Sequence, residues 1–220
     1  WSEEQKMGTL EVLLTLPLKT SELVMGKFLA GLTLVGAALT LTLPLPWMVS
    51  QLGPLDVGPV VGGYLATLLL ASSYLAIGLC VSALSDNQIV SLMLTLVVCG
   101  ALYFLGSDTL MGFVSQDGGE LLAALGSGSR FMSVERGVID LRDLLYYVSL
   151  TAFFLSLNTL AIERKRLEVS PLDRPSHWKA ARWGAALLGL NLILSNVLLH
   201  NERPGRLDLT EEGLYTVSDV

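Results

Sequence analysis

Residues Val57–Ser85, VGPVVGGYLATLLLASSYLAIGLCVSALS, form a long apolar run without a single Asp, Glu, Lys or Arg. Four more runs share this property: Phe28–Leu55, Asn87–Ser107, Leu144–Ile162 and Trp183–Asn201. Each is about as long as the roughly 20 residues that a helix needs to cross the hydrocarbon core of a bilayer. Because one charge at mid-bilayer costs about 2.5–3.5 kcal/mol on insertion scales, the runs predict an all-α polytopic membrane protein with five transmembrane helices.

The composition supports this class of protein. The mean hydropathy is +0.59, and 15% of the residues are charged, against about 25% in ordinary globular domains. The chain has no basic face dense enough to bind a nucleic acid, and we expect the lipid bilayer as its environment. Because it opens at Trp1 without Met, we expect an excerpt of a longer protein.

Basic residues indicate the orientation of the spans. If the N-terminus is cytoplasmic, the inner segments hold nine basic residues: Lys6, Lys19, Lys27, Arg164, Lys165, Arg166, Arg174, Lys179 and Arg182. The outer segments then hold five: Arg130, Arg136, Arg142, Arg203 and Arg206. Since cytoplasmic segments carry the excess of Lys and Arg, this count favours a cytoplasmic N-terminus.

The predicted organisation follows from these spans. We expect a cytoplasmic segment at 1–25, a transmembrane domain at 26–162, a basic cytoplasmic linker at 163–182, and a single span that opens an exported domain at 183–220. The transmembrane domain contains spans at about 26–49, 58–84, 88–106 and 144–162, with an outer segment at 107–143.

Residues 1–18 have the pattern of an amphipathic surface helix. Met7, Leu10 and Leu14 recur at helical spacing, and most charged residues fall on other faces. Pro17 is expected to end this helix, because proline disfavours helical backbone at the residue before it. Thr20 or Ser21 is then expected to cap the next helix.

Further local signals concern the ends of the spans. Pro44 and Pro46 are expected to kink the first span. Ser85 and Gln88 have the spacing of a capping box at an inner turn. Arg136 and Asp140 have the spacing of an ion pair on a helix that leads into the fourth span.

Two segments outside the spans are less regular. The outer segment is compatible either with short amphipathic helices or with a plain folded loop. Alternating polar and apolar residues at 206–210 suggest the start of a β-containing domain.

The sequence contains no catalytic or ligand-binding motif that we recognise. It lacks the phosphate-binding P-loop and H-E-x-x-H, and the only histidines, His177 and His200, are predicted on opposite sides of the membrane. We therefore expect no enzymatic activity, no cofactor and no metal site. The expected spans also lack ionisable residues, which disfavours a proton-driven secondary transporter.

Residues 4–17, EQKMGTLEVLLTLP, followed by SELVMGKF at 21–28, resemble the cytoplasmic coupling segment of type 2 ABC transporter permeases. YLAIGL at 74–79, SDNQ at 85–88 and RGVIDLRD at 136–143 are similar to the GldF-type permeases associated with gliding motility. RLDLTE at 206–211 and LYTVS at 214–218 resemble the opening of the partner protein GldG. The chain thus looks like a fusion of the two, without the two spans that normally precede the coupling segment.

This resemblance implies a permease subunit in the bacterial inner membrane, working with a separate ABC ATPase subunit and a second permease copy. ATP hydrolysis in that ATPase would drive export or work on the cell envelope, and the resemblance to GldF-type permeases associates this work with gliding. The resemblance places Glu4, Gly8, Thr9, Leu10, Glu11, Leu14 and Pro17 at the ATPase interface. It makes Arg136, Asp140, Arg142 and Asp143 candidates for closing the outer exit. The alternative is a membrane anchor or scaffold for the exported domain, without a transport pathway.

Overall fold

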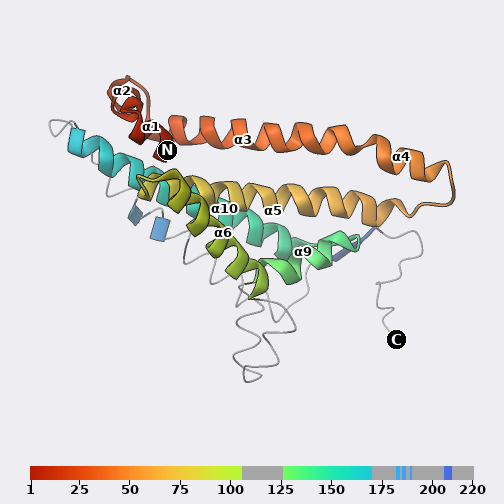
Figure 1. Cartoon of the computed structure of the whole chain (residues 1–220). Coiled ribbons are helices and arrows are strands. Elements are labelled where there is room, and N and C mark those ends of the chain that lie inside the picture. The colour runs from red at the N-terminus through yellow and green to blue at the C-terminus, as the bar shows by residue number, and fades with distance from the viewer. Residues whose placement is uncertain (106–125, 170–181, 184, 187–188, 190–205, 210–220) are drawn as a thin grey trace. The chain divides into compact units, whose positions relative to one another are not determined.

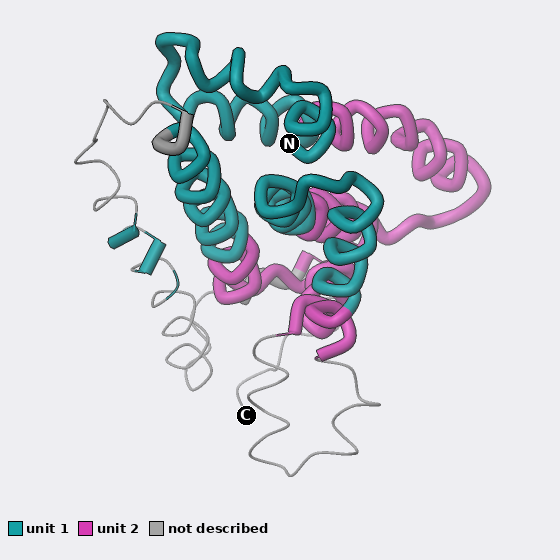
Figure 2. The backbone as a smooth tube through the Cα atoms, turned by 60° about the vertical axis from the view of Figure 1, so that its left-hand side comes forward, with its two compact units in different colours: residues 1–32, 72–100, 148–193 teal, residues 33–71, 101–147, 194–220 magenta. Residues whose placement is uncertain are grey.

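The computed structural model describes residues 1–105, 126–169, 182–183, 185–186, 189 and 206–209. The chain forms two compact units, which Figure 2 shows in separate colours. Unit 1 comprises Trp1–Leu32, Ser72–Gly100 and Val148–Ile193, and unit 2 comprises Thr33–Ala71, Ala101–Tyr147 and Leu194–Val220.

Long apolar helices dominate the described chain (Figure 1): α3 (Thr20–Thr42), α5 (Val57–Leu84), α6 (Gln88–Phe104) and α10 (Leu141–Val169). Within the described residues, three helical stretches are long and apolar enough to cross a membrane, namely Thr20–Ser50, Val57–Leu84 and Leu141–Arg166. The 17-residue α6 is a shorter apolar helix. The predicted all-α fold is confirmed, whereas most of the fifth predicted span lies outside the described residues.

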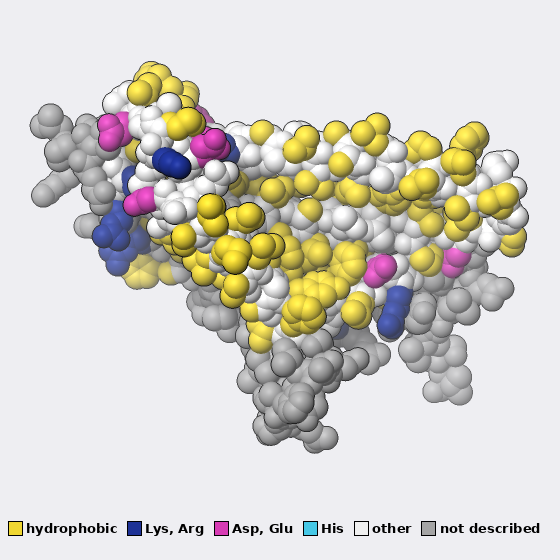
Figure 3. All heavy atoms as spheres, in the orientation of Figure 1, with side chains coloured by type: hydrophobic (Ala, Val, Ile, Leu, Met, Phe, Trp, Pro, Cys, Tyr) yellow, Lys and Arg dark blue, Asp and Glu magenta, His cyan; other side chains and the backbone are white. Residues whose placement is uncertain are grey.

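The observed helices extend beyond the charge-free runs. Helix α3 begins at Thr20 and therefore includes Lys27. Helix α10 includes Asp143 near its start and continues through the basic residues 164–166, where we expected a linker. Ionisable groups are thus present near the ends of the spanning helices, although their central turns are free of them. Figure 3 shows hydrophobic side chains spread along these helices.

The first span is interrupted by its prolines, as predicted. Helix α3 ends at Thr42, and α4 (Pro44–Ser50) begins after Leu43. Pro44 stands at the first position of α4, where the missing N–H would have had no intrahelical partner. A proline inside a helix removes a backbone hydrogen bond, so the helix restarts at this point.

The N-terminal segment forms two short helices, and the prediction of one continuous helix was wrong. Helix α1 (Ser2–Lys6) and helix α2 (Thr9–Thr15) are separated at Gly8, whose φ is +70°. Glycine adopts this left-handed backbone without the steric cost of a Cβ. Pro17 ends α2 as predicted, with Leu16 in extended conformation at ψ 147°.

The break at Gly8 changes which side chains of this segment are buried. Helical spacing placed Met7, Leu10 and Leu14 on one apolar face, but only Leu10 and Leu14 are buried and Met7 is 62% exposed, so the shared face was wrong. Helical spacing relates side chains only along one continuous helix. Met7 precedes the break and therefore points away from the face that α2 buries.

The capping predictions were wrong in detail. At the start of α3, the Lys19 N–H donates to the Glu22 carboxylate at 3.2 Å, and Thr20 donates its hydroxyl to Glu163 at 2.5 Å. At α6, the cap is Asn87, whose side-chain oxygen accepts the Ile89 N–H at 2.9 Å. Asn87 does this in place of the expected pair of Ser85 with Gln88, because α6 begins only one residue after it.

The core of unit 1 joins the N-terminal segment to three long helices. Its buried residues come from α2, α3, α5 and α10 and from the residue that precedes α1: Trp1, Leu10, Leu14, Val24, Ala83 and Ile162. Burying a large apolar side chain contributes about 1.5–3 kcal/mol. Leu10 and Leu14 therefore fix α2 firmly against the membrane helices of this unit.

Unit 2 contains α9 (Ser127–Glu135) and a short antiparallel ladder. Strand β1 (Val138–Asp140) pairs with strand β2 (Arg206–Asp208), with Ile139 opposite Leu207. The helical alternative for the outer segment is thus confirmed over 127–135, and the strand expected at the start of 206–210 is confirmed over 206–208. The predicted ion pair between Arg136 and Asp140 on one helix was wrong, because residues 138–140 form a strand.

Close backbone contact joins α5 to the segment that follows α9. A Cβ on Gly62 would lie 2.3 Å from the Val134 carbonyl oxygen and 3.0 Å from the Gly137 Cα. Gly137 itself has φ +86°, and a Cβ there would lie 2.9 Å from the Gly58 carbonyl carbon. These glycines permit an approach that no other residue would allow.

We predict that Gly62→Ala destabilises the protein by about 1–3 kcal/mol, because the new methyl group has no room against backbone atoms. The measurement is thermal unfolding of the purified protein in detergent. The matched control is Gly63→Ala, since a Cβ on Gly63 meets nothing within 4 Å. Both changes alter helix propensity equally, so equal unfolding temperatures for the two variants would contradict the observed packing.

Candidate functional site

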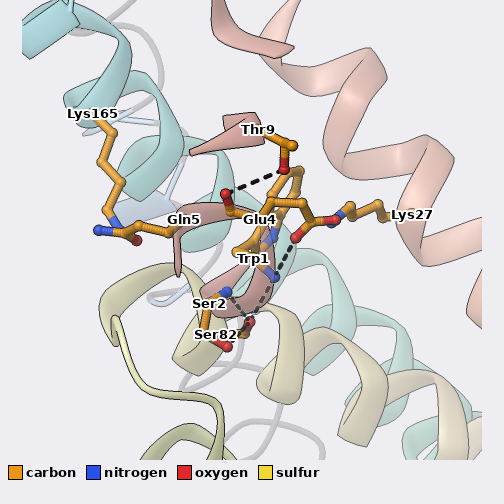
Figure 4. A network of polar contacts seen from close by, with 8 residues as sticks. All are labelled: Trp1, Ser2, Glu4, Gln5, Thr9, Lys27, Ser82 and Lys165. Atoms are coloured by element: carbon orange, nitrogen blue, oxygen red, sulfur yellow. Dashed lines mark hydrogen bonds and ion pairs between the residues drawn. The ribbon is translucent and has the colours of Figure 1, made fainter. Parts of the chain in front are cut away.

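The N-terminal segment is attached to α3 by charged and aromatic contacts (Figure 4). The Lys27 ammonium forms an ion pair with the Glu4 carboxylate, and its Nζ lies 4.0 Å from the centre of the Trp1 ring. The backbone N–H of Ser2 donates to the Ser82 hydroxyl of α5 at 3.1 Å. Helix α1 is therefore held against both α3 and α5.

Gln5 extends these contacts to two further segments. Its amide nitrogen donates to Asp86, in the turn between α5 and α6, at 2.6 Å. Its amide oxygen accepts a hydrogen bond from Lys165 of α10, whose Nζ also lies 3.9 Å from an Asp86 carboxylate oxygen. A single side chain of α1 thus connects the α5–α6 turn with the basic end of α10.

The pKa of Glu4 is lowered, although its causes oppose each other. Burial raises this pKa, whereas hydrogen bonds and nearby positive charges, those of Lys27 among them, lower it by more in total. The Glu4 carboxylate therefore remains charged at neutral pH, as an ion pair with Lys27 requires.

The residues expected at an ATPase interface divide into two groups. Leu10 and Leu14 are 4% and 7% exposed and pack into the unit 1 core, while Glu4 is half-buried beside Lys27. These three hold the segment in place. Gly8, Thr9, Glu11 and Pro17 are exposed.

Four apolar residues that were not expected at the interface accompany the exposed group. They are Met7, Val12, Leu16 and Leu18, each at least 40% exposed. We define the α1–α2 surface as these eight exposed residues: Met7, Gly8, Thr9, Glu11, Val12, Leu16, Pro17 and Leu18. Val12 lies two residues from both Leu10 and Leu14, so the helical spacing of α2 by itself places it on the face opposite these buried residues.

Unit 2 contains a buried ion pair that local spacing rules did not reveal. The Arg130 guanidinium of α9 contacts the Asp143 carboxylate of α10 at 2.9 Å, and both side chains are 8% exposed. Arg130 also lies over the Tyr146 ring, with its Cζ 4.5 Å from the ring centre. Beside it, the Tyr147 hydroxyl donates to the Ser127 carbonyl at 2.7 Å.

The four candidates for the outer exit occupy different environments. Asp143 pairs with Arg130, whereas Asp140 pairs with Arg142 at 3.3 Å and accepts its backbone N–H at 2.9 Å. Arg136 is exposed at the end of α9. Within the part of the chain that the structure describes, no three His, Cys, Asp or Glu side chains gather as a metal site would require.

Comparison with known families gives one match. The profile of the ABC-2 family transporter proteins matches residues 2–163, which include every helix from α1 to α9 and most of α10. No curated protein and no solved structure matches the chain.

We predict that Arg130→Ala destabilises the protein by about 3–5 kcal/mol, because it leaves the buried Asp143 carboxylate without its partner. Thermal unfolding in detergent measures the effect. The matched control is Arg142→Ala, which removes a less deeply buried pair and is expected to cost less than Arg130→Ala, because Asp140 keeps its hydrogen bond from the backbone N–H at position 142. A second variant, Arg130→Ala with Asp143→Asn, is expected to recover part of the loss. Equal stability of the two single variants would show that the buried pair has no special role.

Proposed function

Because the chain belongs to the ABC-2 transporter family and is a membrane permease subunit of an ABC transporter, we propose that its α1–α2 surface couples the membrane helices to a separate ATPase subunit. The observation that carries this proposal is the combination of a firmly attached N-terminal segment with an exposed apolar face. Exposed apolar residues rimmed by polar ones are typical of protein interaction sites. The permease itself is not the catalyst of ATP hydrolysis in this proposal.

The attachment of α1 and α2 is suited to transmitting force. Lys27 connects the segment to α3, Asp86 to the α5–α6 turn and Lys165 to α10. A push on the α1–α2 surface would therefore reach several membrane helices of unit 1 together. A surface helix attached to lipid alone would need none of these contacts.

The contacts also support the orientation derived from the basic residues. The N-terminal segment, the α5–α6 turn and the basic end of α10 were all expected on the cytoplasmic side, and they contact one another in unit 1. The start of α5, helix α9 and Gly137, which precedes β1, were expected outside, and they contact one another in unit 2. If successive spans cross the membrane in alternate directions, the first group of segments lies together on the inner side and the second group on the outer side.

The pairing of β1 with β2 supports the fifth predicted span. Paired strands lie on one side of a membrane, because a sheet edge cannot stand open in hydrocarbon. The chain crosses once in α10 between these strands, so we propose that it returns through residues 183–201 before β2. Residues 206–220 would then begin an exported domain similar to GldG.

A cysteine pair tests this topology. Ile139→Cys with Leu207→Cys is expected to form a disulfide in cells, because directly opposed residues in a ladder have Cα atoms about 4.5–5.5 Å apart, within the disulfide range. The control pair, Ile139→Cys with Leu209→Cys, is displaced by two residues and is expected to crosslink much less. Non-reducing electrophoresis measures both. Equal crosslinking of the pairs, or none in either, would contradict the ladder.

Finer features of the proposal rest on the sequence resemblance. They are a GldF-type identity with a role in gliding, a homodimer of permeases, and location in the inner membrane of a bacterium. The family match over residues 2–163 favours a permease over a membrane anchor or scaffold without a pathway.

Charge reversal at Glu11 tests the coupling role. Glu11→Lys is expected to reduce co-purification of the ATPase at least tenfold, because Glu11 is exposed in the middle of the α1–α2 surface. The measurement is the ratio of ATPase to permease after affinity purification, together with the ATPase rate of the complex.

Two further variants separate contact from folding. Val12→Ser is expected to weaken ATPase binding without lowering the unfolding temperature, since Val12 is 64% exposed. Glu3→Lys, an exposed charge reversal outside the defined surface, is expected to leave binding unchanged. If Glu11→Lys and Val12→Ser both retain full binding and full ATPase stimulation, the α1–α2 surface is not the coupling interface.

A further inference from the structure

A groove in unit 2 lies between α3, α5 and α9, with a volume of about 470 Å³. Leu39, Val60 and Phe131 provide apolar walls from these three helices. Thr42 and Tyr64 add hydroxyl groups, and Glu135 adds a carboxylate. The groove therefore combines an apolar interior with a small number of polar groups, as sites for small amphiphilic ligands do.

The hydroxyl groups in this groove donate their protons to acceptors within the protein. Thr42 donates to the Leu39 carbonyl at 2.7 Å, and Thr67 donates to the Gly63 carbonyl at 2.7 Å. The Tyr64 and Thr42 oxygens lie 2.8 Å apart. Since the Thr42 proton points to Leu39, Tyr64 must be the donor in this contact, because each hydroxyl has one proton.

What remains available to a ligand is a set of acceptors. The Tyr64 oxygen retains a lone pair, and the Glu135 carboxylate accepts hydrogen bonds without donating any. Glu135 is the one charged side chain among the residues that line the groove, and it is exposed. A ligand whose polar group also only accepts, such as a phosphate or a carboxylate, would find no donor here and would be repelled by Glu135.

We propose that this groove binds a long-chain amphiphile with a primary ammonium head. The hydrocarbon chain lies against Leu39, Val60 and Phe131, and the ammonium donates to Glu135 and to the Tyr64 oxygen. An ammonium offers three donors and a positive charge, which complements the acceptors and the carboxylate. A charge-assisted hydrogen bond of this kind is stronger than one between neutral groups.

This binding site is independent of the proposed coupling role. Its residues all belong to unit 2, whereas the α1–α2 surface belongs to unit 1. Loss of ligand binding would leave ATPase binding intact, and the variants at Glu11 and Val12 would leave ligand binding intact. The two proposals can therefore fail separately.

The test is calorimetric titration of dodecylammonium into the purified full chain in phosphatidylcholine nanodiscs, with the heat from empty nanodiscs subtracted. We expect saturable binding of one molecule per chain. Glu135→Gln is expected to weaken binding about tenfold, because it removes a charge-assisted hydrogen bond. Glu135→Asp keeps the charge and is expected to retain most of the affinity.

Two controls distinguish this ligand from other occupants. Glu3→Gln, an exposed carboxylate in unit 1, is expected to leave the affinity unchanged. Dodecanol, which has the same chain without the charge, is expected to bind weakly and with equal affinity to the wild type and Glu135→Gln. The proposal is overturned if dodecylammonium gives no saturable heat. It is also overturned if Glu135→Gln binds as the wild type does, or if dodecanol binds as tightly as dodecylammonium, since the groove would then take a neutral lipid chain.

Discussion

Hydrocarbon cannot solvate a charge or an unpaired backbone group, and this constraint underlies the whole structure. It requires long helices that satisfy their own backbone, and it keeps ionisable side chains out of their central turns. The charges that occur in these helices lie near their ends and have partners, such as Lys27 with Glu4 and Asp143 with Arg130. The candidate sites of this permease therefore lie where the helices end.

The attachment of the N-terminal segment combines two kinds of interaction with different roles. Burial of Leu10 and Leu14 supplies most of the free energy, at about 1.5–3 kcal/mol for each side chain. The half-exposed contacts of Glu4 and Gln5 contribute less, since ion pairs open to solvent are worth about 0–1 kcal/mol. These contacts are directional, however, and they therefore fix the orientation of α1 against α3, α10 and the α5–α6 turn. The apolar core thus holds the segment, the polar contacts orient it, and the opposite face remains open for a partner.

Unit 2 is held together by contacts that leave little freedom to adjust. Gly62 and Gly137 bring backbones together where no side chain fits, and the Arg130–Asp143 pair is buried beside Tyr146. Breaking such a pair costs more than the pair contributes, because one buried charge would be left alone. The neighbouring groove has its hydroxyl protons engaged internally, so its polarity is set by the protein before any ligand arrives.

The sequence alone determined the features that follow from local chemistry. Charge-free runs predicted the membrane helices, Pro44 predicted the interruption of the first span, and Pro17 predicted the end of α2. The tertiary structure decided the rest, because it depends on groups that are distant in the chain. The left-handed backbone at Gly8 changed which side chains face the core, so Met7 could not be placed by periodicity. Arg130 meets Asp143, and β1 meets β2, only after the intervening chain has folded, and no spacing rule connects residues across such a fold.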